Sequence, residues 1–111
     1  MSQFLASHAQ FIGKGYCYGK LYMVSWFPGA VLSNNTSEKV YGMLFEIKNP
    51  GTVFKALDDY EGVDEHLFKR VTTTAFVNNK PIHTWVYVYN LSVVGLKQIT
   101  SGDFLKHTVN N

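Results

Sequence analysis

The sequence contains very little cysteine and only scattered charge, and these shortages exclude several classes of protein. Cys17 is the single cysteine, so an internal disulfide cannot form. The Lys and Arg residues stand singly apart from Lys69-Arg70, and the net charge is only +2, so no basic stripe predicts a nucleic-acid partner. One thiol fits a reducing setting, and we expect a cytoplasmic protein.

The sequence also lacks long apolar runs and the spacing of metal or phosphate sites. No run approaches the roughly 18 residues that span a membrane, and no signal-peptide pattern opens the chain, so we expect no membrane partner. The four histidines show no metal-ligand spacing, and Gly13-x-Gly15 lacks the strand that precedes a phosphate loop. We therefore predict neither a metal nor a cofactor.

What the chain does contain is typical of one folded unit. Its 111 residues are enough for a single domain over residues 1–111, and 46% of them are hydrophobic. Aromatic residues reach 15%. This richness indicates β structure and a core or cavity lined with rings.

The pattern of apolar and turn-forming residues predicts an α+β fold. The expected helices cover residues 3–11, a segment beginning at Asn49-Pro50, and residues 101–106. The expected strands cover residues 16–24, 40–47, 68–77 and 82–89, with a loop over 25–39. Asn78-Asn79-Lys80 predicts the turn of a hairpin.

The middle helix has the clearest boundaries. Asn49 is a good cap, Pro50 fits the first turn, and Gly62 is placed to end the helix. Helical spacing turns one set of side chains inward: Val53, Phe54, Leu57 and Tyr60.

The strand over residues 82–89 has two well-filled faces. His83, Trp85, Tyr87 and Tyr89 alternate with Ile82, Thr84, Val86 and Val88. Because both faces look covered, we expect this strand to be central in its sheet. The aromatic face is either core packing or a pocket wall, in which case the Tyr87 hydroxyl would serve as a polar handle.

Residues 57–62 carry the most informative motif, Leu-Asp-Asp-Tyr-Glu-Gly. Five of the chain's eight acidic residues lie between Asp58 and Glu65. Carboxylates at a helix end are usually solvated charges, and this is the expectation for Asp58 and Asp59. Glu61 lies where the chain changes direction. A carboxyl group held there against apolar walls has a raised pKa and can act as a general base or acid.

These motifs together resemble the gamma-glutamylcyclotransferase-like family over roughly residues 5 to 104. The matching segments, in order, are Tyr22 with residues 27–31, then residues 40–45, 57–62, 68–71 and 84–89. The resemblance implies a small mixed, partly open β-barrel with short flanking helices. It also implies a cavity for a γ-glutamyl amine or γ-glutamyl amino acid.

The resemblance implies roles for four residues. Glu61 falls on the family's catalytic acid and base, and the substrate-binding positions fall on Tyr87, Gly62 and Tyr22. The implied reaction is intramolecular: the α-amine of a γ-glutamyl group attacks its own γ-carbonyl, forms 5-oxoproline and releases an amine or amino acid. It needs no cofactor.

The sequence departs from the family at its start. The family opens with a strand ending in Tyr-Gly-Thr/Ser-Leu, whose turn holds the glutamyl end, and nothing before Phe4 matches it. Tyr18-Gly19-Lys20-Leu21 imitates the motif but lies too far along the chain, and Phe68 replaces a common tyrosine. We therefore expect an N-terminally truncated domain with weak turnover.

A missing strand would leave a sheet edge unpaired, and we expect it to be covered either by another chain, in a homodimer or a strand exchange, or by the N-terminal segment. The alternative to an enzyme is a non-catalytic relative of the same fold that binds a small molecule or a protein. Turnover of γ-glutamyl dipeptides would separate the two.

Overall fold

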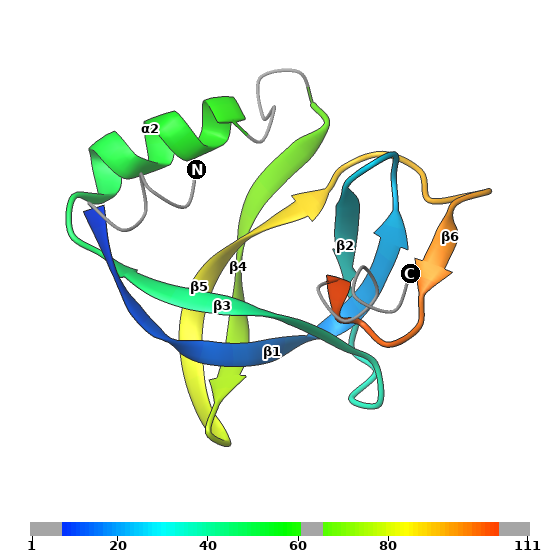
Figure 1. Cartoon of the computed structure of the whole chain (residues 1–111), viewed down its shortest axis with the longest axis horizontal. Coiled ribbons are helices and arrows are strands. Elements are labelled where there is room, and N and C mark those ends of the chain that lie inside the picture. The colour runs from blue at the N-terminus through cyan, green and yellow to red at the C-terminus, as the bar shows by residue number, and fades with distance from the viewer. Residues whose placement is uncertain (1–7, 61–65, 105–111) are drawn as a thin grey trace.

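The computed structural model describes residues 8–60 and 66–104. Over these residues the chain forms β1 (Ala9–Met23), β2 (Pro28–Leu32), β3 (Lys39–Ile47), α2 (Pro50–Tyr60), β4 (Phe68–Val77), β5 (Lys80–Tyr89) and β6 (Lys97–Ile99). The six strands belong to one antiparallel arrangement that does not close on itself, with α2 at one end (Figure 1). This is the partly open α+β barrel that the sequence predicts.

Strand β1 connects the whole arrangement. Its first part pairs with β3, in register from Ala9↔Ile47 to Tyr18↔Lys39. Its second part pairs with β2 on one side and with β6 on the other, so Leu21 has partners in both. One strand-register pair among the described residues, Tyr16↔Phe76, links β1 to β4 of the β4–β5 hairpin.

The helix predicted for residues 3–11 is wrong from Ala9 onward, where the chain is already in β1; residues 1–7 lie outside the described residues. The ring of Phe11 packs edge-on against Phe45 of β3, at 5.6 Å between centroids. Gly13 and Gly15 lie within this strand, and the register between β1 and β3 shifts in a bulge between Phe11 and Gly13. A Cβ on Gly15 would lie 2.5 Å from the Phe76 carbonyl oxygen, so only glycine lets β4 approach there.

The loop predicted for residues 25–39 contains a strand, β2, that the sequence reading missed. Its Pro28-Gly29 start is typical of a turn, yet Gly29 lies where a Cβ would be 2.9 Å from the side chain of Tyr89. The short strand β6 was also missed. Of the helix predicted for residues 101–106, the described part is a turn followed by Phe104, and residues 105 and 106 lie outside it.

Helix α2 begins where the sequence predicts. The Val53 N–H donates to the Asn49 carbonyl at 3.0 Å, and Val53 and Leu57 are buried. Tyr60 was predicted to turn inward, but it is 63% exposed, because the helix packs only its Val53–Leu57 stripe against the sheet. Gly62, the expected end of the helix, lies outside the described residues. Within those residues no helix has the length and hydropathy that a membrane crossing requires.

The β4–β5 hairpin follows the prediction closely. Asn78 and Asn79 form the two-residue turn, with φ of 53° and 64°, the left-handed region that asparagine tolerates. Pairing then runs from Val77↔Lys80 to Phe68↔Tyr89. The position of β5 differs from the prediction. Among residues 8–60 and 66–104 it pairs only with β4, so it is an end strand and not a central one.

Candidate functional site

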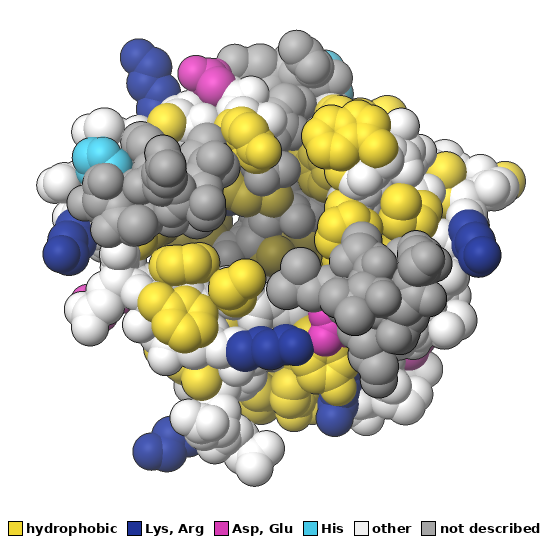
Figure 2. Space-filling view, in the orientation of Figure 1, with side chains coloured by type: hydrophobic (Ala, Val, Ile, Leu, Met, Phe, Trp, Pro, Cys, Tyr) yellow, Lys and Arg dark blue, Asp and Glu magenta, His cyan; other side chains and the backbone are white. Residues whose placement is uncertain are grey.

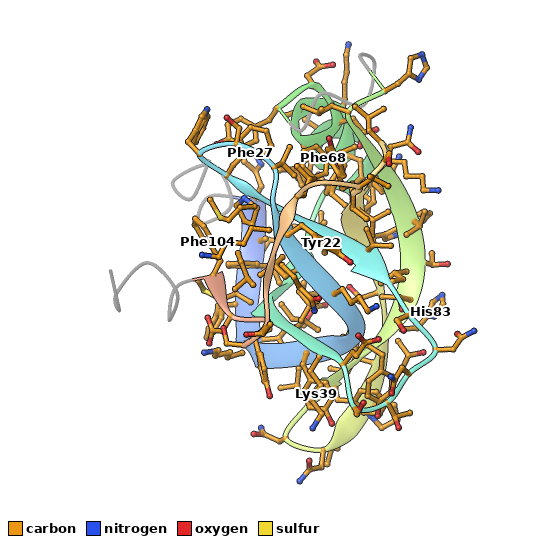
Figure 3. All side chains as sticks on the ribbon, turned by 90° about the vertical axis from the view of Figure 1, so that its right-hand side faces the viewer. Tyr22, Phe27, Lys39, Phe68, His83 and Phe104 are labelled. Carbon is orange, nitrogen blue, oxygen red and sulfur yellow. The ribbon has the colours of Figure 1, made fainter. Side chains whose placement is uncertain are left out.

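A cavity of about 810 Å³ lies inside the open barrel, and every described element except β6 contributes to its wall. Figure 2 shows hydrophobic side chains gathered around a hollow in this face. The aromatic residues of the wall are Tyr16, Trp26, Phe27, Tyr41, Tyr60, Phe68, Trp85 and Tyr87. Phe27 and Phe68 meet at one end, with ring centroids 6.1 Å apart (Figure 3). The cavity is therefore suited to a small organic ligand.

Charge is scarce in this wall. Asp59 is the only charged residue that the described part of the chain contributes to it. Cys17 also borders the cavity, and burial raises the pKa of its thiol above the usual value, so it is held in the neutral form. The buried, neutral thiol serves as a small hydrophobic side chain. Within residues 8–60 and 66–104, no group of three His, Cys, Asp or Glu side chains could hold a metal ion.

Tyr87, predicted to be a substrate-binding residue, lies at the cavity wall. Its hydroxyl donates a hydrogen bond to Oδ1 of Asp58, in the last turn of α2. A carboxylate only accepts hydrogen bonds, so the phenol is the donor in this contact. The polar handle expected of Tyr87 is therefore already engaged by the protein.

Arg70 completes a group that we call the Asp58 cluster, made of Asp58, Arg70 and Tyr87. The guanidinium donates from Nε to Asp58 Oδ1 at 3.0 Å and from Nη2 to Oδ2 at 3.3 Å. It also lies over two rings, 4.1 Å from the Phe54 centroid and 4.7 Å from that of Trp85. A two-pronged contact of this kind fixes the geometry of both groups.

The expectation that Asp58 is a solvated end charge is wrong. Its side chain is only 25% exposed because α2 lies over the hairpin and brings it against Arg70. The sequence held one signal: Arg70 and Tyr87 are direct cross-strand partners, so their side chains share a face. What sequence reasoning lacked was the placement of α2 on that face. Asp59, by contrast, is exposed, as expected.

Glu61 and Gly62, the other predicted residues of the acidic motif, lie outside the described residues, so their roles stay predictions. Glu61 directly follows Tyr60, the last residue of α2, and Tyr60 borders the cavity. The last described residue before Glu61 therefore lies at the cavity wall.

Tyr22 lies elsewhere. It lies near the end of β1, where it is paired with Gly29 of β2 and Gln98 of β6 (Figure 3). Its neighbour Leu21 borders the cavity, whereas Tyr22 is not among the lining residues. The structure thus brings Tyr87 to the cavity but not Tyr22, whose substrate role stays a prediction.

Comparison with known proteins adds the family. The model of the gamma-glutamyl cyclotransferase, AIG2-like family matches residues 1–106. The chain belongs to this family. A search of the curated proteins found no match.

Solved structures share the fold of this cyclotransferase-family chain. YtfP from Escherichia coli is 28% identical, with a TM-score of 0.67 over 94% of this chain and 84% of that one. YkqA from Bacillus subtilis has a TM-score of 0.75 at 17% identity, and the uncharacterized protein PH0828 from Pyrococcus horikoshii has 0.70 at 17%. The alignment with PH0828 covers 99% of this chain and 82% of that one.

The match with YkqA covers 97% of this chain but only 36% of that protein, so the chain spans about a third of its length. The similarities at 17% identity establish the fold alone. Together with the family match they confirm the resemblance seen in the sequence.

Proposed function

We propose that the protein converts a γ-glutamyl group to 5-oxoproline and releases an amine or amino acid, with Glu61 as the acid and base. One observation carries the proposal: the chain belongs to the gamma-glutamyl cyclotransferase, AIG2-like family, and its cavity wall includes Tyr60, which directly precedes Glu61 in the sequence.

The reaction is a ring closure within one molecule. The α-ammonium of the substrate loses a proton to the Glu61 carboxylate, and the resulting amine attacks the γ-carbonyl carbon. As the tetrahedral intermediate collapses, the leaving nitrogen takes a proton from the Glu61 carboxyl and departs as the free amine, and the ring nitrogen gives up its second proton to leave the neutral lactam. Both reacting groups already belong to one molecule, so the site has to supply orientation and proton transfer only.

The cavity supports this chemistry through its apolar lining. Aromatic walls remove water from the carboxyl group of a neighbouring glutamate, which disfavours the charged form and raises its pKa toward neutrality. A base with a pKa near the working pH is the most effective one. The cavity volume of about 810 Å³ also leaves room for a leaving group beyond the glutamyl chain.

The experiment is a turnover assay on a panel of γ-glutamyl amines and γ-glutamyl dipeptides, with 5-oxoproline measured directly. We expect product from at least one member and none after Glu61→Gln, which keeps the size of the side chain but removes the base. Binding of the panel without any product, in a folded protein, would instead identify a non-catalytic member of the family.

We also propose a homodimer, because β5 has one strand partner among the described residues. In a hairpin closed by a two-residue turn, alternate residue pairs exchange hydrogen bonds, starting with Val77 and Lys80. The N–H groups of His83 and Trp85 therefore point away from β4, toward the open edge. An edge of this kind pairs readily with the same edge of a second copy.

A proline at position 83 tests the dimer sharply. His83→Pro removes an N–H that faces the open edge and spares those that bond β4. We expect light scattering to give twice the 12.6 kDa of one chain for the wild type, and a single chain for the variant. A wild-type monomer at high concentration contradicts the proposal.

A further inference from the structure

The Asp58 cluster joins three elements at the point where the chain approaches Glu61. Asp58 comes from the last turn of α2, Arg70 from β4 and Tyr87 from β5. Arg70 and Tyr87 are paired directly across the hairpin, so both side chains point to the face on which α2 lies. Asp58 precedes Glu61 by three residues in the chain, close to the length of one helical turn.

The charges of the cluster are balanced and partly removed from water. The side chains of Arg70 and Asp58 are 26% and 25% exposed, and the guanidinium engages both carboxylate oxygens. Asp58 therefore faces a matched counter-charge, and a carboxylate accepts hydrogen bonds but cannot donate one. This makes Tyr87 the donor to Asp58, whatever else contacts its oxygen.

That assignment determines how Tyr87 meets a ligand in the cavity. A phenol has one proton and two lone pairs. With the proton directed to Asp58, the oxygen can offer a ligand only its lone pairs, and the Asp58 charge makes the oxygen a stronger acceptor. In the proposed substrate the strongest donor is the α-ammonium group.

We propose that Asp58 and Arg70 are positioning residues that direct the Tyr87 hydroxyl, so that its oxygen accepts a hydrogen bond from the α-ammonium of the γ-glutamyl group. This inference rests on the proposed function, because it names the part of that substrate which Tyr87 recognises. Arg70 holds the carboxylate in place through its fork and its stacking on Phe54 and Trp85.

A pair of ligands that differ only in the α-amine tests the inference without requiring turnover. The first is a γ-glutamyl amide, and the second is the matching glutaryl amide, which lacks the amine. Binding is followed by tryptophan fluorescence, since Trp85 and Trp26 border the cavity. We expect the wild type to bind the amine-bearing ligand more tightly, and Asp58→Asn and Tyr87→Phe to lose about tenfold in affinity for that ligand only.

Asp58 must act through Tyr87, so the two changes should not add. The Asp58→Asn, Tyr87→Phe double variant is expected to bind the amine-bearing ligand as weakly as either single variant. If the affinity losses of the two single variants multiply in the double variant, or if they are equal for both ligands, the inference is overturned and Asp58 has a purely structural role. If Asp58→Asn does not fold, Arg70→Lys replaces it in the cycle, because lysine keeps the charge but loses the fork.

Two matched controls complete the design. Asp103→Asn removes an ion-paired aspartate that does not line the cavity, and Tyr89→Phe removes a hydroxyl two residues along the same strand. Both should leave the preference between the two ligands unchanged. Failure of cyclisation with an intact, Asp58-dependent preference for the amine would reject the proposed reaction and support this inference.

Discussion

Two regions of this chain satisfy their half-buried polar groups in different ways. In the ribbon region, made of the second part of β1 with β2 and β6, strands flank β1 on both sides and the core residues Leu21 and Ile99 are 5% and 3% exposed. In the hairpin region, made of α2, β4 and β5, the end strand has one strand partner among the described residues. In that region, side-chain hydrogen bonds of the Asp58 cluster connect the helix to the two strands.

The difference indicates which region mainly stabilises the fold and which region serves function. The ribbon region satisfies its polar groups by backbone pairing, and its share of the cavity wall is apolar: Leu21, Pro28 and Ala30. The hairpin region keeps half-buried polar groups beside a large cavity, an arrangement more costly to the fold and more useful to chemistry. Substitutions in the first should change stability, and substitutions in the second should change turnover.

The largest expected effect is that of Glu61→Gln at the end of the hairpin region. Loss of the proposed general base should lower turnover by about 10²–10⁴-fold while the free energy of unfolding stays close to the wild-type value. The rate of 5-oxoproline release and a urea titration check the two halves of this statement. Glu46→Gln, an exposed position on β3, is the matched control, and an equal loss of rate there would remove the assignment.

In the ribbon region, Ile99→Ala should lower stability and leave turnover unchanged, the opposite of Glu61→Gln. Truncating this buried side chain should cost about 2–5 kcal/mol of unfolding free energy, through lost burial and the cavity it leaves. The turnover of the folded fraction should stay unchanged, because Ile99 does not border the large cavity. Urea titrations and kinetics at low temperature measure both, with Gln98→Ala at an exposed neighbouring position as control. A changed KM would show that the two regions are not separate.

Gly29→Ala probes the contact where the two regions meet. A Cβ there would lie 2.8 Å from Val24 and 2.9 Å from Tyr89, at the approach of β2 to β5. We expect a loss of roughly 1–3 kcal/mol from overpacking, together with a raised KM because β5 must shift. Gly51→Ala is the control, since no atom lies within 4 Å of its added Cβ. An unchanged KM would mean that β2 does not support the cavity wall.

The smallest expected effect comes from Asp103→Asn. Its ion pair with Lys14, 2.9 Å long, involves a lysine side chain that is 57% exposed. Such surface pairs contribute roughly 0–1 kcal/mol, and salt weakens them. Thermal unfolding in low and high salt should show a small difference that disappears at high salt. A loss as large as that of Ile99→Ala would contradict the comparison.

The sequence predicts the hairpin region better than the ribbon region, because the signals in the hairpin region are local in the sequence and those in the ribbon region are not. Asn49-Pro50 starts a helix and Asn78-Asn79 close a hairpin through local backbone preferences, and both are observed. Residues 9–11 and 28–32 carry no comparable local signal. They become strands because each finds a distant partner: Phe45 of β3 faces Phe11, and Leu21 of β1 faces Ala30.

The candidate site was predictable only in part. Tyr87 was identified through the family resemblance, and the structure places it at the cavity. Asp58 was taken for a solvated charge, since nothing in its own segment shows that Arg70, twelve residues later, will face it. The pattern shows which side chains share a face, but not which helix covers that face.

The two asparagines at the tip of the hairpin control more than a change of direction. Because Val77 and Lys80 are held opposite each other there, the count along both strands places Tyr87 opposite Arg70 at the far end. One residue added to the turn would slide β5 by a single step, and a step of one exchanges the two faces of a strand. Val86 or Val88 would then lie opposite Arg70, and the Tyr87 hydroxyl would turn away from Asp58. The length of this distant turn thus sets the strand register on which the Asp58 cluster depends.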